Sequence, residues 1–107
     1  MEYRRADRRY DRQVAIDFVY EGQSFSARTR NISLGGVFIE TDAKLPWGAR
    51  LRLRLRVPTA GEPIETEGQV RWCEAGDEHA GVGVRFDGLR AREVWALNRF
   101  FTRAIDE

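Results

Sequence analysis

The segment Asn31-Ile32-Ser33-Leu34-Gly35-Gly36 separates two runs of strand-like sequence and holds little that a core could bury. Asn and Ser have short polar side chains that hydrogen-bond nearby backbone, and both favour turns. The two successive glycines permit positive φ values and let another group approach the backbone closely. On its own this composition predicts a hairpin turn, since Asn, Ser and Gly are ordinary turn residues.

An arginine cluster precedes the first strand-like run. Residues 1–12 show no core-facing periodicity, so they are predicted to form a flexible arm ahead of a single domain over residues 13–107. A charged terminus is commonly only solvated, but guanidinium groups also grip phosphates and stack on flat bases. An arginine-rich arm and a polar glycine turn together suit a small phosphate ester that carries bases. The arginines are Arg4, Arg5, Arg8, Arg9 and Arg12.

About six runs of the sequence have strand character. Most of them alternate apolar and polar residues, which is the period of a half-buried strand. Closing so few strands into a barrel removes the edges that would otherwise invite aggregation. We therefore predict an all-β fold, a six-stranded antiparallel barrel. The runs lie at about residues 14–20, 24–30, 37–39, 50–57, 64–70 and 81–86.

One helix is predicted after the last strand, over about residues 89–105. Asp87 is a suitable N-cap residue for it. An amphipathic stripe follows at helical spacing. Trp95 and Phe100 lie off this stripe, and aromatic side chains exposed there would indicate a partner protein or a homodimer. The stripe consists of Val94, Leu97, Phe101 and Ile105.

Arginines alternate with leucines over residues 50–57 and could form a nucleic-acid-binding stripe. The next strand carries glutamates on its polar face. In an antiparallel hairpin we expect Arg56 to lie opposite Glu65. Two residues along, Arg54 would lie opposite Glu67. Such pairs contribute only about 0.2–1 kcal/mol each, but they neutralise the stripe, so we predict a solvated, ion-paired face. The arginine stripe is Arg50, Arg52, Arg54 and Arg56.

Composition narrows the function classes. The chain has 107 residues, enough for one domain, and a formal net charge of +1, so long-range attraction to nucleic acid or membranes is weak. The one cysteine, Cys73, excludes an internal disulfide and is consistent with a cytoplasmic protein. We find no secretory leader and no apolar run long enough to span a bilayer.

No catalytic or metal-binding constellation emerges from the sequence. The lone histidine, His79, has no Cys, His or carboxylate at ligand spacing. Paired carboxylates beside a cleft motif and a Ser–His–Asp set are both missing. We therefore predict a non-enzymatic protein with no metal and no cofactor.

Two motifs in this order resemble the PilZ domain family, the bacterial receptor module for the second messenger cyclic di-GMP. The family's (Asp/Asn)-x-Ser-x-x-Gly motif matches at Asn31, Ser33 and Gly36. Its Arg-x-x-x-Arg motif matches at Arg8 and Arg12, which lie closest to the first strand. Arg5 and Arg9 fit the same spacing, so that register stays open. The resemblance covers nearly the whole chain and implies a six-stranded barrel with a terminal helix.

The resemblance also implies roles for individual residues. Arg8 and Arg12 would hold the phosphates and stack on guanine, with Arg9 assisting. Asn31 and Ser33 would bond a guanine edge or a phosphate. Guanidinium forks suit this ligand, because they bind phosphate bidentately and stack on purine faces.

The remaining candidate site residues are two glycines and a tryptophan. Gly35 and Gly36 would leave room for the nucleotide, and Trp72 matches an aromatic residue often found near the family's pocket. A tryptophan buried inside the barrel is the alternative for Trp72. Family members that bind an intercalated pair of ligands often carry Arg where this chain has Asp7, so one or two ligands per site both remain open.

The sequence thus predicts a cyclic di-GMP receptor that changes conformation on binding and signals to an effector protein, which nothing in the sequence identifies. One alternative is a PilZ-like adaptor that binds protein and no nucleotide. Another is a small-barrel single-stranded nucleic-acid binder, against which the near-neutral charge counts.

Overall fold

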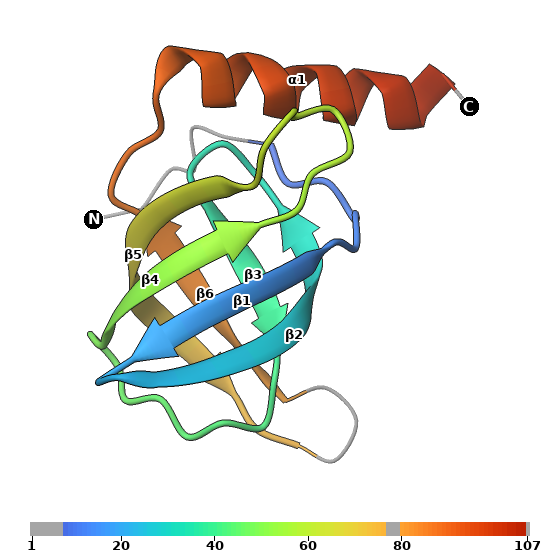
Figure 1. Cartoon of the computed structure of the whole chain (residues 1–107). Helices are drawn as coiled ribbons and strands as arrows, with labels where there is room; N and C mark the ends of the chain where they lie inside the picture. Colours follow the sequence, from blue (N-terminus) through green and yellow to red (C-terminus); the bar gives the residue numbers. More distant parts are fainter. Residues whose placement is uncertain (1–7, 77–79, 107) are drawn as a thin grey trace, which may run out of the picture.

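The computed structural model describes residues 8–76 and 80–106, and it confirms the predicted barrel with a C-terminal helix. The strands close in the order β1-β2-β3-β6-β5-β4, every neighbouring pair antiparallel, and α1 lies across one end of the barrel (Figure 1). Arg4, Arg5, Asp7 and His79 lie outside the described residues. The elements are β1 (Ala15–Tyr20), β2 (Gln23–Ile32), β3 (Gly36–Glu40), β4 (Arg50–Leu55), β5 (Ile64–Glu74), β6 (Gly81–Phe86) and α1 (Ala91–Asp106).

The barrel closes between β1 and β4, where Phe18 pairs with Leu53. Both side chains are fully buried, because alternation along each strand sends every second residue into the interior. Each strand therefore has two neighbours and no open edge. The β1–β2 hairpin turns at Glu21 and Gly22, whose φ values of 50° and 83° belong to a type I′ turn.

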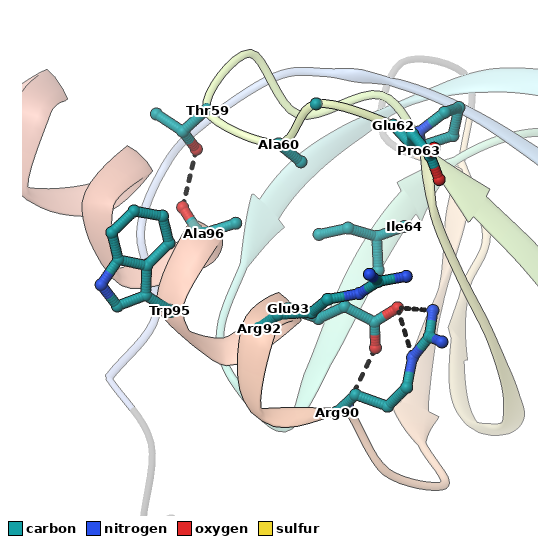
Figure 2. Close-up of a pocket in the computed structure, with 11 residues that line it drawn as sticks. Thr59, Ala60, Glu62, Pro63, Ile64, Arg90, Arg92, Glu93, Trp95 and Ala96 are labelled. Atoms are coloured by element: carbon teal, nitrogen blue, oxygen red, sulfur yellow. Dashed lines mark hydrogen bonds and ion pairs between the residues drawn. The ribbon is translucent and has the colours of Figure 1, made fainter.

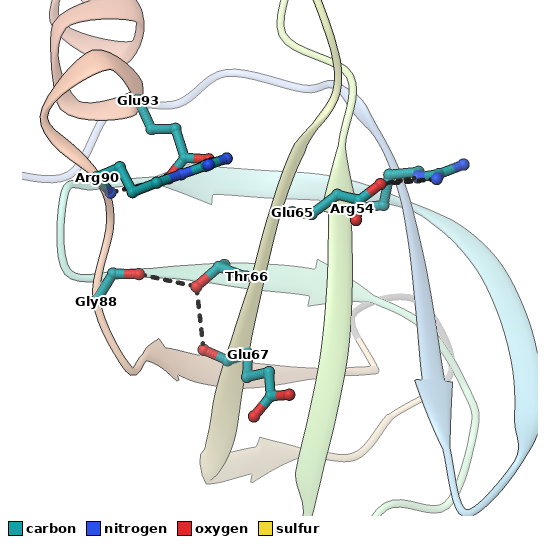
Figure 3. A network of polar contacts seen from close by, with 7 residues as sticks. All are labelled: Arg54, Glu65, Thr66, Glu67, Gly88, Arg90 and Glu93. Atoms are coloured by element: carbon teal, nitrogen blue, oxygen red, sulfur yellow. Dashed lines mark hydrogen bonds and ion pairs between the residues drawn. The ribbon is translucent and has the colours of Figure 1, made fainter.

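The arginine stripe on β4 is ion-paired, as predicted, but the predicted partners are wrong by two residues. Arg54 lies opposite Glu65, and their side chains are 2.7 Å apart (Figure 3). Arg56 lies beyond β4 and pairs with Asp17 of β1 instead, at 2.7 Å. The chain leaves β5 after Leu55, because the backbone N–H of Arg56 bonds Ala15. A shift of two residues leaves every side chain on its predicted face, so the inward and outward sets were still predicted correctly.

The helix begins at Ala91, and Asp87 is not its N-cap. The side chain of Asp87 hydrogen-bonds Arg50 of the stripe instead. Glu93 in the first turn accepts a hydrogen bond from the backbone N–H of Arg90 at 2.9 Å, which is one half of a capping box. Of the predicted stripe, Leu97 and Phe101 are buried and Val94 is half-buried, whereas the side chain of Ile105 is not described. No helix in the described part of the chain is long and apolar enough to cross a bilayer.

Candidate functional site

A β-bulge at the end of β2 turns Asn31 to the outside of the barrel. Thr29 pairs with Ile39 and Asn31 with Phe38, so Arg30 is one extra residue on β2. In an unbroken strand Thr29 and Asn31 would share a face. Thr29 is fully buried, whereas the bulge leaves Asn31 beside the outward-facing Phe38. Bulges often re-aim side chains next to functional sites. Asn31 is therefore the last outward residue of a strand, and the predicted turn begins only at Ser33.

A second bulge, in β5, turns Trp72 to the outside of the barrel. Val70 pairs with Val84 and Trp72 with Gly83, which leaves Arg71 as the extra residue. Val70 is fully buried and Trp72 is 36% exposed, so Trp72 lies on the outer surface and not inside the barrel.

The glycines of β6 form the floor under two aromatic rings. A Cβ atom on Gly83 would overlap the ring of Trp72, and one on Gly81 would overlap the ring of Phe38. The two rings lie side by side, with centroids 6.1 Å apart. The Gly-x-Gly pair thus lets flat side chains lie directly on the strand. Arg30 covers Phe38 at 4.2 Å and is ion-paired with nearby carboxylates, those of Glu40 and Glu74.

Arg9 joins the two sequence motifs at this surface. Its Nη1 donates a hydrogen bond of 2.8 Å to Oδ1 of Asn31. Its guanidinium carbon lies 4.9 Å from the ring centroid of Trp72, within range of a cation–π contact. Arg9 from the N-terminal segment, Asn31 from β2 and Trp72 from β5 therefore meet at one place, which we call the Arg9 site.

Tyr10 anchors the arginine segment to the barrel, an anchor that the sequence analysis did not recognise. Tyr10 and Ile32 exchange two backbone hydrogen bonds of 2.9 Å. The Tyr10 ring stacks on Phe101 of α1, with centroids 4.0 Å apart. Arg8 and Arg12 lie on either side of Tyr10 in sequence, with guanidinium carbons 5.2 Å and 5.9 Å from its ring centroid. The mobility expected of residues 1–12 stays a prediction, and residues 1–7 lie outside the described part.

Arg12 holds a buried donor that no described residue satisfies. Its Nε atom is buried without a hydrogen-bond partner among residues 8–76 and 80–106. Its Nη1 donates to the carbonyl of Asp11 at 3.1 Å, and its own carbonyl accepts from the Thr29 hydroxyl at 2.8 Å. An unsatisfied buried donor costs about 1–3 kcal/mol. An oxygen acceptor brought to Arg12 by an anion would recover this energy.

Ser33 and the two glycines shape the turn between β2 and β3. The buried Ser33 hydroxyl accepts hydrogen bonds of 3.1 Å from the backbone N–H groups of Gly35 and Gly36. Neither glycine has a positive φ. Gly36 is needed for another reason, because a Cβ atom there would overlap the carbonyl oxygen of Val84 on β6. The carbonyl of Gly35 accepts a hydrogen bond from Phe86 at 2.9 Å.

The PilZ domain model matches residues 3–103 of this chain. The chain belongs to the PilZ domain family. Its fold is similar to that of the Bacillus subtilis inhibitor of motility MotI, with a TM-score of 0.81 and 22% identity over 99% of this chain and 54% of that one. It is also similar to the PilZ domain with c-di-GMP of YcgR from Escherichia coli, with a TM-score of 0.73 and 14% identity over 96% and 95% of the two chains.

The Borreliella burgdorferi PlzA protein in complex with c-di-GMP is a third similar fold, with a TM-score of 0.62 and 15% identity over 81% of this chain and 32% of that one. The chain therefore spans about half of MotI and a third of PlzA. A comparison with proteins of curated function gave no match.

The PilZ motif residues fall into three groups in the structure. Arg9, Asn31 and Trp72 are in contact at the Arg9 site. Ser33 and the glycines of the second motif hold the turn, and the Ser33 hydroxyl is occupied within it. Arg8 and Arg12 lie against Tyr10. The described residues include no group of three or more His, Cys, Asp or Glu side chains that could hold a metal ion.

Sequence reasoning missed three residues at or beside the Arg9 site, namely Tyr10, Phe38 and Gly83. Tyr10 stood in a charged segment without apolar periodicity, and its partner Phe101 is far away in sequence. Phe38 and Gly83 were assigned only to strands. A Gly-x-Gly within a strand was a usable signal, because glycine in a strand interior often marks a close approach by another group.

Proposed function

We propose that this PilZ domain is a receptor for cyclic di-GMP and acts by binding, without catalysing a reaction. Family membership supports this, as do the similar folds of YcgR and PlzA, which were both solved with c-di-GMP. The observation that carries the proposal is the Arg9 site. One guanidinium, one amide side chain and one indole converge on the outside of the barrel. Such groups bind phosphate, read a base edge and stack on a base, respectively.

Each group would take a separate part of the ligand. Arg8 and Arg12 would bind the phosphates, and the Nε of Arg12, for which residues 8–76 and 80–106 hold no acceptor, would gain one. Arg9 would give up its bond to Asn31 and stack on a guanine, which frees the Asn31 amide to pair with a guanine edge. Trp72 would stack on the other face of a base. Because Ser33 is bonded within its turn, it would contribute mainly by holding that turn.

Binding would reach α1 through Tyr10. The phosphates would draw Arg8 and Arg12 towards the Arg9 site, and Tyr10 lies between them in the chain. Any shift of Tyr10 changes its stacking on Phe101 and hence the contact between α1 and the barrel. The ligand would stabilise one arrangement of these elements over another, and an effector protein would recognise the difference. The mobility predicted for the arm would be lost at the same step, at an entropic cost that the Tyr10 anchor already reduces.

Calorimetric titration with cyclic di-GMP, linear pGpG and GTP tests the proposal. We expect cyclic di-GMP to bind far more tightly, because only the closed dinucleotide meets both motifs at once. Its end point also gives the number of ligands per chain. Equal affinity for the linear nucleotides would contradict the proposal, and no binding of any of them would favour the adaptor alternative. Length-dependent binding of single-stranded RNA with a steep salt dependence would indicate a nucleic-acid binder instead.

A further inference from the structure

A cavity of about 340 Å³ lies between the β4–β5 loop and the first turns of α1 (Figure 2). The loop side is lined by Glu62, Pro63 and Ile64, and the helix side by Arg92, Trp95 and Ala96. The Thr59 hydroxyl donates a hydrogen bond of 2.7 Å to the carbonyl of Ala96. This bond holds the loop against the helix and fixes the two walls of the cavity. The volume is enough for one apolar side chain.

Trp95 stands at the edge of this cavity and is 60% exposed. The guanidinium carbon of Arg99, one turn further along the helix, lies 4.9 Å from its ring centroid. Exposed tryptophan and arginine side chains are the residue types that contribute most to binding at protein interfaces. A partner that covered this pair would bury the indole ring of Trp95 while Arg99 stayed in contact with it.

The exposed face of α1 is basic. Arg92, Trp95 and Arg99 follow one another at helical spacing, so they lie on one side of the helix, and both arginines are exposed. Between residues 91 and 103 the one acidic residue is Glu93. It is buried and its carboxylate is bonded to a third arginine, Arg90, at 2.8 Å, so Arg92 and Arg99 leave that face with an excess of positive charge. A partner that covers this face of α1 should therefore carry carboxylates.

We propose that the α1 surface, which consists of this cavity and of Arg92, Trp95 and Arg99, binds a segment of a partner protein. That segment has one apolar side chain, which enters the cavity, flanked by Asp or Glu residues that face the arginines. The binding mode resembles the capture of a short anchored peptide in a groove.

Other occupants fit this surface less well. An interfacial membrane helix needs a broad apolar face. Leu97 and Phe101 of α1 are buried against the barrel, and among the side chains of residues 91–103 Trp95 is the large apolar one left exposed. A symmetric contact between two copies would bring two basic faces together, which is unfavourable.

The α1 surface is separate from the proposed nucleotide site, since it shares no residue with the Arg9 site. Loss of partner binding with retained cyclic di-GMP binding, or the reverse, separates the two proposals.

The test uses peptides of about twelve residues with a central Leu, Ile, Phe or Trp among glutamates, added to the ¹⁵N-labelled chain. We expect at least one peptide to shift the backbone amide signals of residues 59–62 and 92–99 saturably. The Trp95→Ala variant should weaken that binding at least about tenfold, as an interface anchor does. Arg99→Gln should weaken it too.

Matched variants serve as controls. Trp47 is 67% exposed and has Arg71 over its ring at 5.6 Å, so Trp47→Ala removes a similar pair elsewhere. Trp47→Ala and Arg52→Gln should change peptide affinity by less than about twofold, as distant surface changes do. The proposal is overturned if no acidic peptide shifts the α1 signals up to millimolar concentration, or if lysine-flanked peptides bind equally well. It is also overturned if Trp95→Ala abolishes instead the binding of anionic vesicles, of single-stranded RNA or of a second copy.

Discussion

The ring of Tyr10 stacks on the ring of Phe101, with centroids 4.0 Å apart and planes 10° apart. This contact joins the segment that carries Arg8, Arg9 and Arg12 to the helix at the other end of the sequence. Tyr10 also holds Arg9 in place, because its two backbone hydrogen bonds to Ile32 bring the neighbouring residue next to Asn31. Tyr10 is therefore the structural link between the candidate ligand site and α1.

Replacing Tyr10 should affect both stability and binding. In Tyr10→Leu the stacking energy is lost, which should lower the free energy of unfolding by about 0.5–1.5 kcal/mol. Affinity for cyclic di-GMP should fall as well, because the segment keeps its backbone bonds to Ile32 but loses the ring that stacks on Phe101 and that Arg8 and Arg12 contact. Urea denaturation and calorimetry measure the two effects. Tyr20→Leu, a half-buried tyrosine away from α1, is the control and should leave affinity unchanged.

Removing either arginine of the first motif should damage binding but not folding. We expect Arg8→Ala and Arg12→Ala each to weaken cyclic di-GMP binding at least tenfold, since a charge-assisted hydrogen bond contributes about 1.5–3 kcal/mol. The thermal transition of the free protein should hardly move for Arg8→Ala, because Arg8 is exposed. For Arg12→Ala, removal of the buried Nε should offset the loss of the contact with Tyr10 and of the Nη1 bond to Asp11. Undiminished affinity in both variants would remove these residues from the site.

Arg54 of the arginine stripe is the control for the Arg8 and Arg12 variants. Arg54→Ala breaks an exposed ion pair with Glu65, so it should cost well under about 1 kcal/mol of stability. It should leave nucleotide affinity nearly unchanged. A large loss of binding in this variant would show that the stripe on β4 belongs to the site.

Gly36 should tolerate no side chain. In Gly36→Ala the new Cβ overlaps the carbonyl oxygen of Val84, so β3 and β6 must separate, at a cost of about 1–3 kcal/mol. Ser33→Ala should be milder for binding, because it loosens the turn without forcing strands apart. Gly61→Ala is the control, since a Cβ there would meet nothing within 4 Å. Equal melting temperatures of the two glycine variants would contradict the close approach of β3 and β6.

Glu93 should make stability depend on pH. Burial raises the pKa of this carboxyl, but hydrogen bonds from the side chain and backbone of Arg90 lower it by more, so the net shift is downward from 4.5. Its folded pKa therefore lies below its unfolded pKa, and its stabilisation is fully present above about pH 4.5 and is lost as pH falls through the folded pKa. The urea midpoint of Glu93→Gln should be lower than that of the unchanged protein at pH 7. Below pH 4.5 it should fall less steeply with decreasing pH than that of the unchanged protein. Parallel curves for the two proteins would refute this role.

Sequence patterning predicted the barrel because alternation on β1 and β4 depends only on neighbouring residues, such as Leu51, Leu53 and Leu55. The β4–β5 register was missed by two residues, since it depends on where the chain leaves β5, and both registers bury the same faces. Asp87 looked like a helix cap, but a partner distant in sequence, Arg50, takes its side chain.

The candidate site was predictable only in part. The motif spacing predicted that the N-terminal arginines and Asn31 form one site. In the structure Arg9 hydrogen-bonds Asn31, whereas Arg8 and Arg12 lie against Tyr10. Alternation alone would place Asn31 on the inner face with Thr29, and the bulge that turns it outward leaves no mark in a single sequence. The Tyr10–Phe101 contact was likewise out of reach, because it joins the two ends of the chain.

The most direct measurement is a ¹H–¹⁵N spectrum recorded during titration with cyclic di-GMP. The indole N–H signal of Trp72 and the backbone signals of Arg9 and Asn31 should shift together and saturate. The backbone signal of Gly22, in the β1–β2 turn at the opposite end of β2 from Asn31, should stay in place as an internal reference. Saturable shifts that leave Trp72, Arg9 and Asn31 unchanged, or no saturable shift at all, would contradict the proposed receptor site.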